Sequence, residues 1–244
     1  GASRSGEVAT LEMPPAAIEL APATLAGLRV DDDDLVELAT ARGRVILPVH
    51  ANETIARGVA SVPMHFGARW LPASPTGINA LTVGALDPLS LQPELKHAAA
   101  RIVRAELAWH AAFVGCAPAD RIGTVLQTLR QHAQACSYAS IVRFGRDGSR
   151  AGIALLVANT SPRAELVEAA RTVFGVAPDA PTLRDAKAGR GRTVCVVGGH
   201  LVAALLEGRT RADVRAWSIY RRLIDQGTDC SQRSLRELFA PVEA

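Results

Sequence analysis

The sequence predicts a mixed α and β protein that begins with a β-barrel and ends in helices. Alternating apolar residues at 35–38 and 45–49 flank a polar turn, which is the pattern of a β-hairpin. Short strands joined by tight turns are typical of a barrel. Helical apolar spacing at 121–135, and an Asp-Gly turn between apolar runs at 137–144 and 153–157, predict a helix and a second hairpin.

The first third of the chain adds three smaller elements. Residues 22–28 read as a short helix, and Asp31 to Asp34 as an acidic turn before the first hairpin. Four adjacent aspartates can hold a metal ion, but such a run is more often a solvated loop. The β-rich stretch 59–64 contains Pro63, which fits an edge or a bulge because proline cannot donate to the ladder.

After the second hairpin, the sequence predicts further helices and a linker. An amphipathic helix is expected at 162–174, and the Gly- and charge-rich stretch 182–192 reads as a linker. Three apolar stripes at helical spacing predict helices near the end, the last of them capped by Ser234. The stripes are Leu201, Ala204 and Leu205; Val214, Trp217, Ile219 and Leu223; and Leu235, Leu238 and Phe239.

Composition narrows the class of protein. With 244 residues, 48% of them hydrophobic and 21% charged, the chain is a globular protein long enough for two domains. The net charge of +3 is too small to indicate nucleic acid, and scattered arginines on the last helices are usually a solvated face. Neither an apolar run of about 18 residues nor a leader pattern is present, so we expect a cytoplasmic protein outside the membrane.

Cysteine usage indicates a reducing compartment. The chain has four cysteines, too few for a disulfide scaffold, and no pair has Cys-x-x-Cys spacing. Each one reads most simply as a small buried hydrophobe. The four are Cys116, Cys136, Cys195 and Cys230.

Five short runs in the first hundred residues carry a family resemblance: 28–36, 41–43, 62–67, 79–82 and 87–96. In this order they resemble the C-terminal cofactor-binding domain of molybdopterin oxidoreductases, the family of nitrate reductases and formate dehydrogenases. The resemblance implies a double-psi β-barrel over residues 1–110, with the start of the domain lying upstream. One departure is Asp33, which stands where the family prefers glycine.

The same resemblance implies the cofactor contacts. In the family an asparagine and a lysine touch one of two molybdopterin guanine dinucleotides (bis-MGD), and these correspond to Asn79 and Lys96. An amide can match the donors and acceptors of a pterin, and an ammonium suits a phosphate oxygen. His65, in the run 62–67, is a third candidate. Without the resemblance, Asn79 reads as a cap, Lys96 as a solvated residue and His65 as a satisfied buried one.

The end of the chain carries a second resemblance. Residues 193–200 and 227–233 are similar to the bacterioferritin-associated-ferredoxin-like domain that follows the barrel in assimilatory nitrate reductases. This implies an α+β connecting segment with a hairpin at 111–190. A degenerate helical ferredoxin-like domain is then expected at 191–244.

The iron–sulfur site of that domain is predicted to be lost. The family holds a [2Fe-2S] cluster through a Cys-x-Cys and a Cys-x-x-Cys pair. Cys195 and Cys230 match the first member of each, as remnants of the motif, but Val197 and Arg233 replace the second members. Neither replacement can donate a lone pair to iron, and His200 does not fall at a ligand position. The two thiols are open to pairing or metal binding under oxidation, although burial is the simpler reading.

These resemblances predict the C-terminal cofactor-binding portion of a molybdenum-dependent nitrate reductase, which reduces nitrate to nitrite. Its partners are then the catalytic domains upstream or a separate catalytic subunit, and an electron-donor protein. The alternative is a non-catalytic barrel subunit or interaction module that has lost its cofactors. The residues that choose nitrate over formate lie largely outside this chain.

Overall fold

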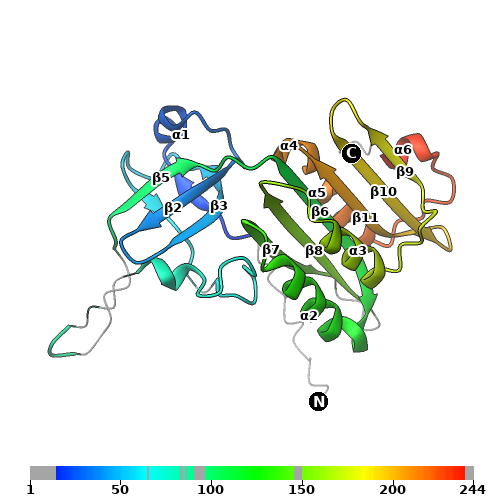
Figure 1. The fold of residues 1–244 in the computed structure, drawn as a ribbon, viewed down its shortest axis with the longest axis horizontal. Coiled ribbons are helices and arrows are strands. Elements are labelled where there is room, and N and C mark those ends of the chain that lie inside the picture. The colour runs from blue at the N-terminus through cyan, green and yellow to red at the C-terminus, as the bar shows by residue number, and fades with distance from the viewer. Residues whose placement is uncertain are drawn as a thin grey trace, which may run out of the picture.

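The computed structural model describes residues 15–64, 66–82, 85, 87–90, 97–145 and 150–239. These residues form two sheets, one of five strands and one of six (Figure 1). We call residues 15–104, which contain the five-stranded sheet, the N-terminal unit. Residues 109–239, which contain the six-stranded sheet, are the C-terminal unit. The fold is therefore mixed α and β, as predicted.

A curled, half-barrel sheet organises the N-terminal unit. Its strand order is β4-β1-β3-β2-β5, with β1 parallel to β3 and the other neighbours antiparallel. The predicted hairpin and the predicted first helix are confirmed, whereas the double-psi topology stays a prediction. The elements are β1 (Ile18–Leu20), α1 (Pro22–Leu28), β2 (Leu35–Thr40), β3 (Arg44–Ala51), β4 (Ala60–Ser61), the 3₁₀ helix η1 (Ile78–Leu81) and β5 (Ala100–Arg104).

The acidic run forms the turn between α1 and β2. Asp33 has φ +70°, a left-handed conformation that favours glycine and is tolerated by aspartate. Its N–H donates to the Val49 carbonyl at 2.8 Å, and an Asp32 carboxylate oxygen accepts from the N–H of Ala51 at 2.8 Å. The aspartates therefore tie the turn to the end of β3.

The C-terminal unit is an antiparallel sheet of order β7-β8-β6-β11-β10-β9. The predicted helix at 121–135, the helix at 162–174 and the hairpin at 137–157 are confirmed. The elements are β6 (Trp109–Pro118), the 3₁₀ helix η2 (Ala119–Arg121), α2 (Ile122–Ala133), β7 (Tyr138–Phe144), β8 (Arg150–Asn159), α3 (Ala164–Val173), β9 (Thr182–Asp185), β10 (Arg190–Val197), β11 (His200–Gly208), α4 (Arg211–Val214), α5 (Trp217–Asp225) and α6 (Leu235–Phe239).

This sheet is the middle of three layers. The segments β6-α2-β7-β8-α3 and β11 follow a β-α-β-β-α-β order, with the β9–β10 hairpin inserted before the last strand. Helices α2 and α3 cover the face to which Phe113 of β6 belongs. Helices α4, α5 and α6 cover the other face, to which Ala112 belongs. Because both faces are covered, the central strands are apolar along their whole length rather than alternating.

Two predictions for the last third are wrong. The expected linker at 182–192 contains strand β9 and the start of β10. The signal was weak because every residue of β9 is exposed and its sequence does not alternate. The stripe that begins at Leu201 is strand β11, which alternates between the two covered faces from Ala203 to Leu206. A strand buried on both sides imitates a helix in apolar spacing.

The sheet also crosses the boundary predicted at residue 190, because β11 pairs with β6. The predicted helical character of 191–244 holds only from α4 onward. Ser234 caps α6 as predicted, since its hydroxyl oxygen accepts from the Glu237 N–H at 3.3 Å while its own N–H donates to the Glu237 carboxylate at 2.7 Å. Across the described part of the chain, no helix has the length and apolar character needed to span a bilayer.

Candidate functional site

Asn79 projects from the short helix η1, which the N-terminal core holds in place. Its neighbours Ile78 and Leu81 are each 5% exposed and pack with the apolar residues of β1, β2 and β3. Asn79 itself is exposed, and its side-chain amide makes no hydrogen bond with other described residues. Its backbone carbonyl accepts from the Thr82 hydroxyl at 3.0 Å. A fixed helix thus presents an amide with unused donors and acceptor.

A glycine brings the run 62–67 against this helix. The N–H of Ile78 donates to the Phe66 carbonyl at 3.1 Å. Gly77 has φ +60°, and a Cβ added there would lie 2.3 Å from the Phe66 carbonyl oxygen and 2.6 Å from Cα of Gly67. Only glycine permits this approach.

The three candidate cofactor residues are therefore only partly placed. The structure brings Asn79 beside the segment that flanks His65. His65 and Lys96 themselves lie outside the described residues, so their roles stay predictions.

The loop between these runs is tied to the C-terminal unit. The N–H of Ile141, on β7, donates to the Trp70 carbonyl at 2.8 Å, and Nε of Arg130, on α2, donates to the Arg69 carbonyl at 3.1 Å. Ala73 packs against the core under α2 and α3. The Arg69 guanidinium lies over the Trp70 ring, 5.3 Å from its centroid. This loop is therefore shared by both units.

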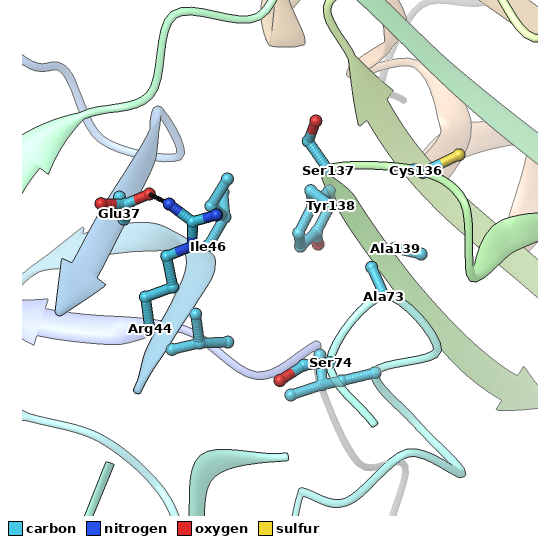
Figure 2. A pocket seen from close by; sticks show the side chains of 11 residues that line it. Glu37, Arg44, Ile46, Ala73, Ser74, Cys136, Ser137, Tyr138 and Ala139 are labelled. Atoms are coloured by element: carbon cyan, nitrogen blue, oxygen red, sulfur yellow. Dashed lines mark ion pairs between the residues drawn. The ribbon is translucent and has the colours of Figure 1, made fainter. Parts of the chain in front are cut away.

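A cleft of about 330 Å³ lies between the two units (Figure 2). The carboxylate of Glu37 and the guanidinium of Arg44 form an ion pair of 3.8 Å on one wall. Ser137 stands on the other wall, and its hydroxyl donates to Asn159 at 2.9 Å rather than to a base. Burial raises the pKa of the Cys136 thiol to about 11, so this cysteine is a poor nucleophile. The lining residues are Glu37, Arg44, Val45, Ile46, Leu71, Ala73, Ser74, Cys136, Ser137, Tyr138 and Ala139.

A buried arginine makes a second contact between the units. Arg211 is 7% exposed, and its Nε and Nη2 donate to one oxygen of Asp33 at 3.1 and 3.0 Å. Its guanidinium also lies 5.4 Å from the centroid of the Tyr138 ring. The sequence reasoning missed Arg211 and Tyr138. The available signal was Asp33, an acidic residue at a position where the resembled family prefers glycine.

The two motif cysteines do not face a common site. Cys195 packs under α2 and α3 with Phe113, whereas Cys230 packs on the opposite side of the sheet with Tyr220. Both thiols are free and buried, and burial raises the pKa of Cys195. Among the described residues, no group of three or more His, Cys, Asp or Glu side chains is arranged to hold a metal. The loss of the [2Fe-2S] cluster stays a prediction.

Sequence comparison finds a family match that includes most of the N-terminal unit. Residues 2–99 match the family model of the molydopterin dinucleotide binding domain. This part of the chain is therefore a molybdopterin dinucleotide-binding domain. The C-terminal unit, from Trp109 onward, lies beyond the matched range.

Individual proteins match a similar share of the chain. A stretch of 87 residues is 37% identical to the F420-dependent formate dehydrogenase subunit alpha of Methanocaldococcus jannaschii, spanning 36% of this chain and 12% of that protein. Among solved structures, acetylene hydratase from Pelobacter acetylenicus matches over 38% of this chain and 14% of its own, with 18% identity and a TM-score of 0.32. The chain thus spans about an eighth of the length of the curated relative.

Proposed function

We propose that this chain is the cofactor-binding portion of a molybdenum-dependent oxidoreductase, and that it holds a molybdopterin guanine dinucleotide shared with catalytic domains upstream. The carrying observation is the exposed amide of Asn79, presented on a fixed 3₁₀ helix inside the matched range. When bound, this cofactor supplies a dithiolene-held molybdenum that exchanges electrons with the substrate. The chain's share is to bind and orient the cofactor.

The residues present fit such a group. A side-chain amide offers two N–H donors and a carbonyl acceptor, which match the edge of a pterin or guanine. Beside it, a Cβ added at Gly67 would meet nothing within 4 Å, so a flat ring can approach the backbone there. We assign Asn79 to the heterocycle. Lys96 is assigned to a phosphate oxygen as a point charge, and His65 to a flanking contact.

For the reaction we propose nitrate reduction to nitrite, which rests on the resemblance of both ends of the chain to assimilatory nitrate reductases. The second candidate is formate oxidation, favoured by the 37% identity to a formate dehydrogenase subunit. The assembled enzyme, purified from its source, distinguishes the two in parallel assays. Nitrite formed from nitrate with a reduced dye supports the first, and dye reduction by formate supports the second.

The assembly around this portion is also a proposal. We place it in the cytoplasm, joined to catalytic domains of the same enzyme or to a catalytic subunit, and supplied by an electron-donor protein. We propose no [2Fe-2S] cluster of its own, because Val197 and Arg233 occupy two ligand positions.

Cofactor content tests the binding role directly. We expect Asn79→Ala and Lys96→Ala each to lower the molybdenum and the releasable guanine nucleotide per enzyme. The matched control is Thr76→Ala, an exposed residue of the same loop, which should keep wild-type content. Full cofactor content in both test variants would overturn the binding role of these residues. Absence of the cofactor from the wild-type assembly would instead favour the alternative, a non-catalytic barrel or interaction module that has lost its cofactors.

A further inference from the structure

We propose that the C-terminal unit is a platform that fixes the loop carrying Asn79, and that Arg130 is its main positioning residue. The consequence for cofactor binding rests on the proposed function, but the platform itself does not. The inference gives a role to residues 109–239, which lie outside the family match.

Consecutive carbonyls of the loop are held from the platform. Arg130 Nε donates to the carbonyl of Arg69 at 3.1 Å, and the Ile141 N–H donates to the carbonyl of Trp70 at 2.8 Å. The donors come from different elements, α2 and β7, both packed into the same core. Two bonds from a rigid body to adjacent peptide groups fix the orientation of the loop as well as its position.

From these carbonyls a short series of bonds leads to Asn79. The N–H groups of Trp70 and Leu71 donate to the Gly67 carbonyl at 2.9 and 3.0 Å, which closes the turn. The preceding residue, Phe66, accepts from Ile78, which is next to Asn79. The amide is thus three hydrogen-bonded steps from α2.

Arg130 lies where a cation is costly unless it makes this bond. It is partly buried, and Arg69 and Arg143 are close enough to repel it. Burial and these like charges lower its pKa. No described carboxylate pairs with it. An arginine held among arginines, with its Nε on a backbone carbonyl, serves the loop rather than an ion pair.

The position of Arg130 on its helix separates this role from folding. Leu126, Leu129 and Ala133 on α2 face the core, whereas the Arg130 guanidinium reaches out to the loop. Replacing it therefore leaves the core of the C-terminal unit unchanged. Loss of the Arg130 side chain should instead loosen the loop.

Hydrogen exchange of the 244-residue chain tests the platform. In Arg130→Ala, amides of residues 66–82 should exchange about tenfold faster, since a hydrogen bond from a charged group has been lost. Amides of β6 and β8 should be unchanged. Arg130→Lys, which restores a cationic donor, should recover part of the protection. Arg121→Gln removes a similar charge from the exposed segment before α2 and should match wild type. Unchanged exchange at 66–82 in Arg130→Ala, or an equal rise throughout the chain, would overturn the proposal.

The consequence for cofactor binding is tested by the cofactor content of the assembled enzyme. We expect Arg130→Ala to lower this content, with partial recovery in Arg130→Lys. If Asn79→Ala loses cofactor while Arg130→Ala, with a loosened loop, keeps all of it, the positioning role is wrong. If Asn79→Ala also keeps all of it, the proposed function fails, and the exchange result still decides the platform.

Discussion

The two units differ in what they contribute to the candidate site. The N-terminal unit matches a known family and carries the candidate cofactor residues, yet between β4 and β5 the described residues form only one short 3₁₀ helix. The C-terminal unit lies beyond the residues that match the family model, yet its sheet is covered on both faces by helices. Binding groups are commonly placed on loops and held by a rigid scaffold. Here the scaffold and the motif lie in different parts of the chain.

The cores show the same contrast. The C-terminal unit buries large aromatic side chains, with Phe113 and Tyr220 both 0% exposed and Tyr138 at 1%. The N-terminal core is built from smaller aliphatic residues on β1, β2, β3 and α1. Apolar burial is the main source of stability, so we expect the C-terminal unit to be the more stable of the two.

The largest effect should come from the C-terminal core. Phe113→Ala removes a fully buried ring beneath α2 and α3 and should lower the free energy of unfolding by about 3–5 kcal/mol. Urea denaturation followed by circular dichroism measures this change. Val196→Ala, at a 38% exposed position on β10, is the matched control and should change it by less than about 0.5 kcal/mol. A loss below about 1 kcal/mol for Phe113→Ala would contradict the assignment of stability to this core.

The contact between the units should have the next largest effect. Asp33→Gly suits the left-handed φ of +70° but leaves Arg211 buried without its carboxylate. We expect the free energy of unfolding to fall by about 2–3 kcal/mol. This is less than the cost of breaking a fully buried pair, because Asp33 is partly exposed.

A double-mutant cycle separates the contact from the turn. Arg211→Met removes the charge, and in Asp33→Gly/Arg211→Met the loss should be smaller than the sum of the two single losses by about 1–3 kcal/mol. Additive losses would show that the units are not coupled through this pair.

The sequence predicted elements whose pattern is local. The hairpin β2–β3, helices α2 and α3, and the hairpin β7–β8 were predicted because alternation, helical spacing or a turn dipeptide lies within a few residues. Strand β11 was read as a helix, because both of its faces are covered by helices that lie elsewhere in the chain, α2 and α3 before it and α4 to α6 after it. Strand β9 was read as a linker, because an exposed edge strand needs no apolar alternation.

The same distinction holds for the candidate site. Asn79 was identified from a motif, and the structure places it on a fixed helix beside the run that contains Phe66. Arg130 and Arg211 were not identified, since their partners lie 61 and 178 residues away along the chain. Contacts of such sequence separation leave no periodic or local pattern.

A smaller effect is expected at the approach of the two motif runs. Gly77→Ala forces alanine into a backbone region favoured by glycine, at a cost of about 1–3 kcal/mol, and its Cβ would overlap the Phe66 carbonyl. Thermal unfolding and hydrogen exchange at 66–82 measure the result. Gly27→Ala is the control, because the exposed Gly27 lies in α1 with open space around it and alanine favours a helix. If Gly77→Ala behaves like Gly27→Ala, the close packing of the two runs is not required.

The smallest effect concerns pH and the junction between the units. His110 is buried at the start of β6. Its Nε2 lies 3.2 Å from the Leu107 carbonyl oxygen, and its Nδ1 has no partner among the described residues. Burial, helped by the nearby Arg211, lowers the pKa of His110, although the Leu107 carbonyl, Asp213 and Asp34 oppose the shift.

A histidine with a lowered folded-state pKa binds its proton first in the unfolded chain. The free energy of unfolding should therefore begin to fall as pH drops below the ordinary value of about 6.5, and the loss should be complete below the folded-state pKa. Urea denaturation at pH 7.5 and 5.0 measures this loss for the wild type and for His110→Gln, which cannot titrate. We expect the wild type to lose more stability over this interval than His110→Gln. Equal losses would show that protonation of His110 does not lower the free energy of unfolding over this interval.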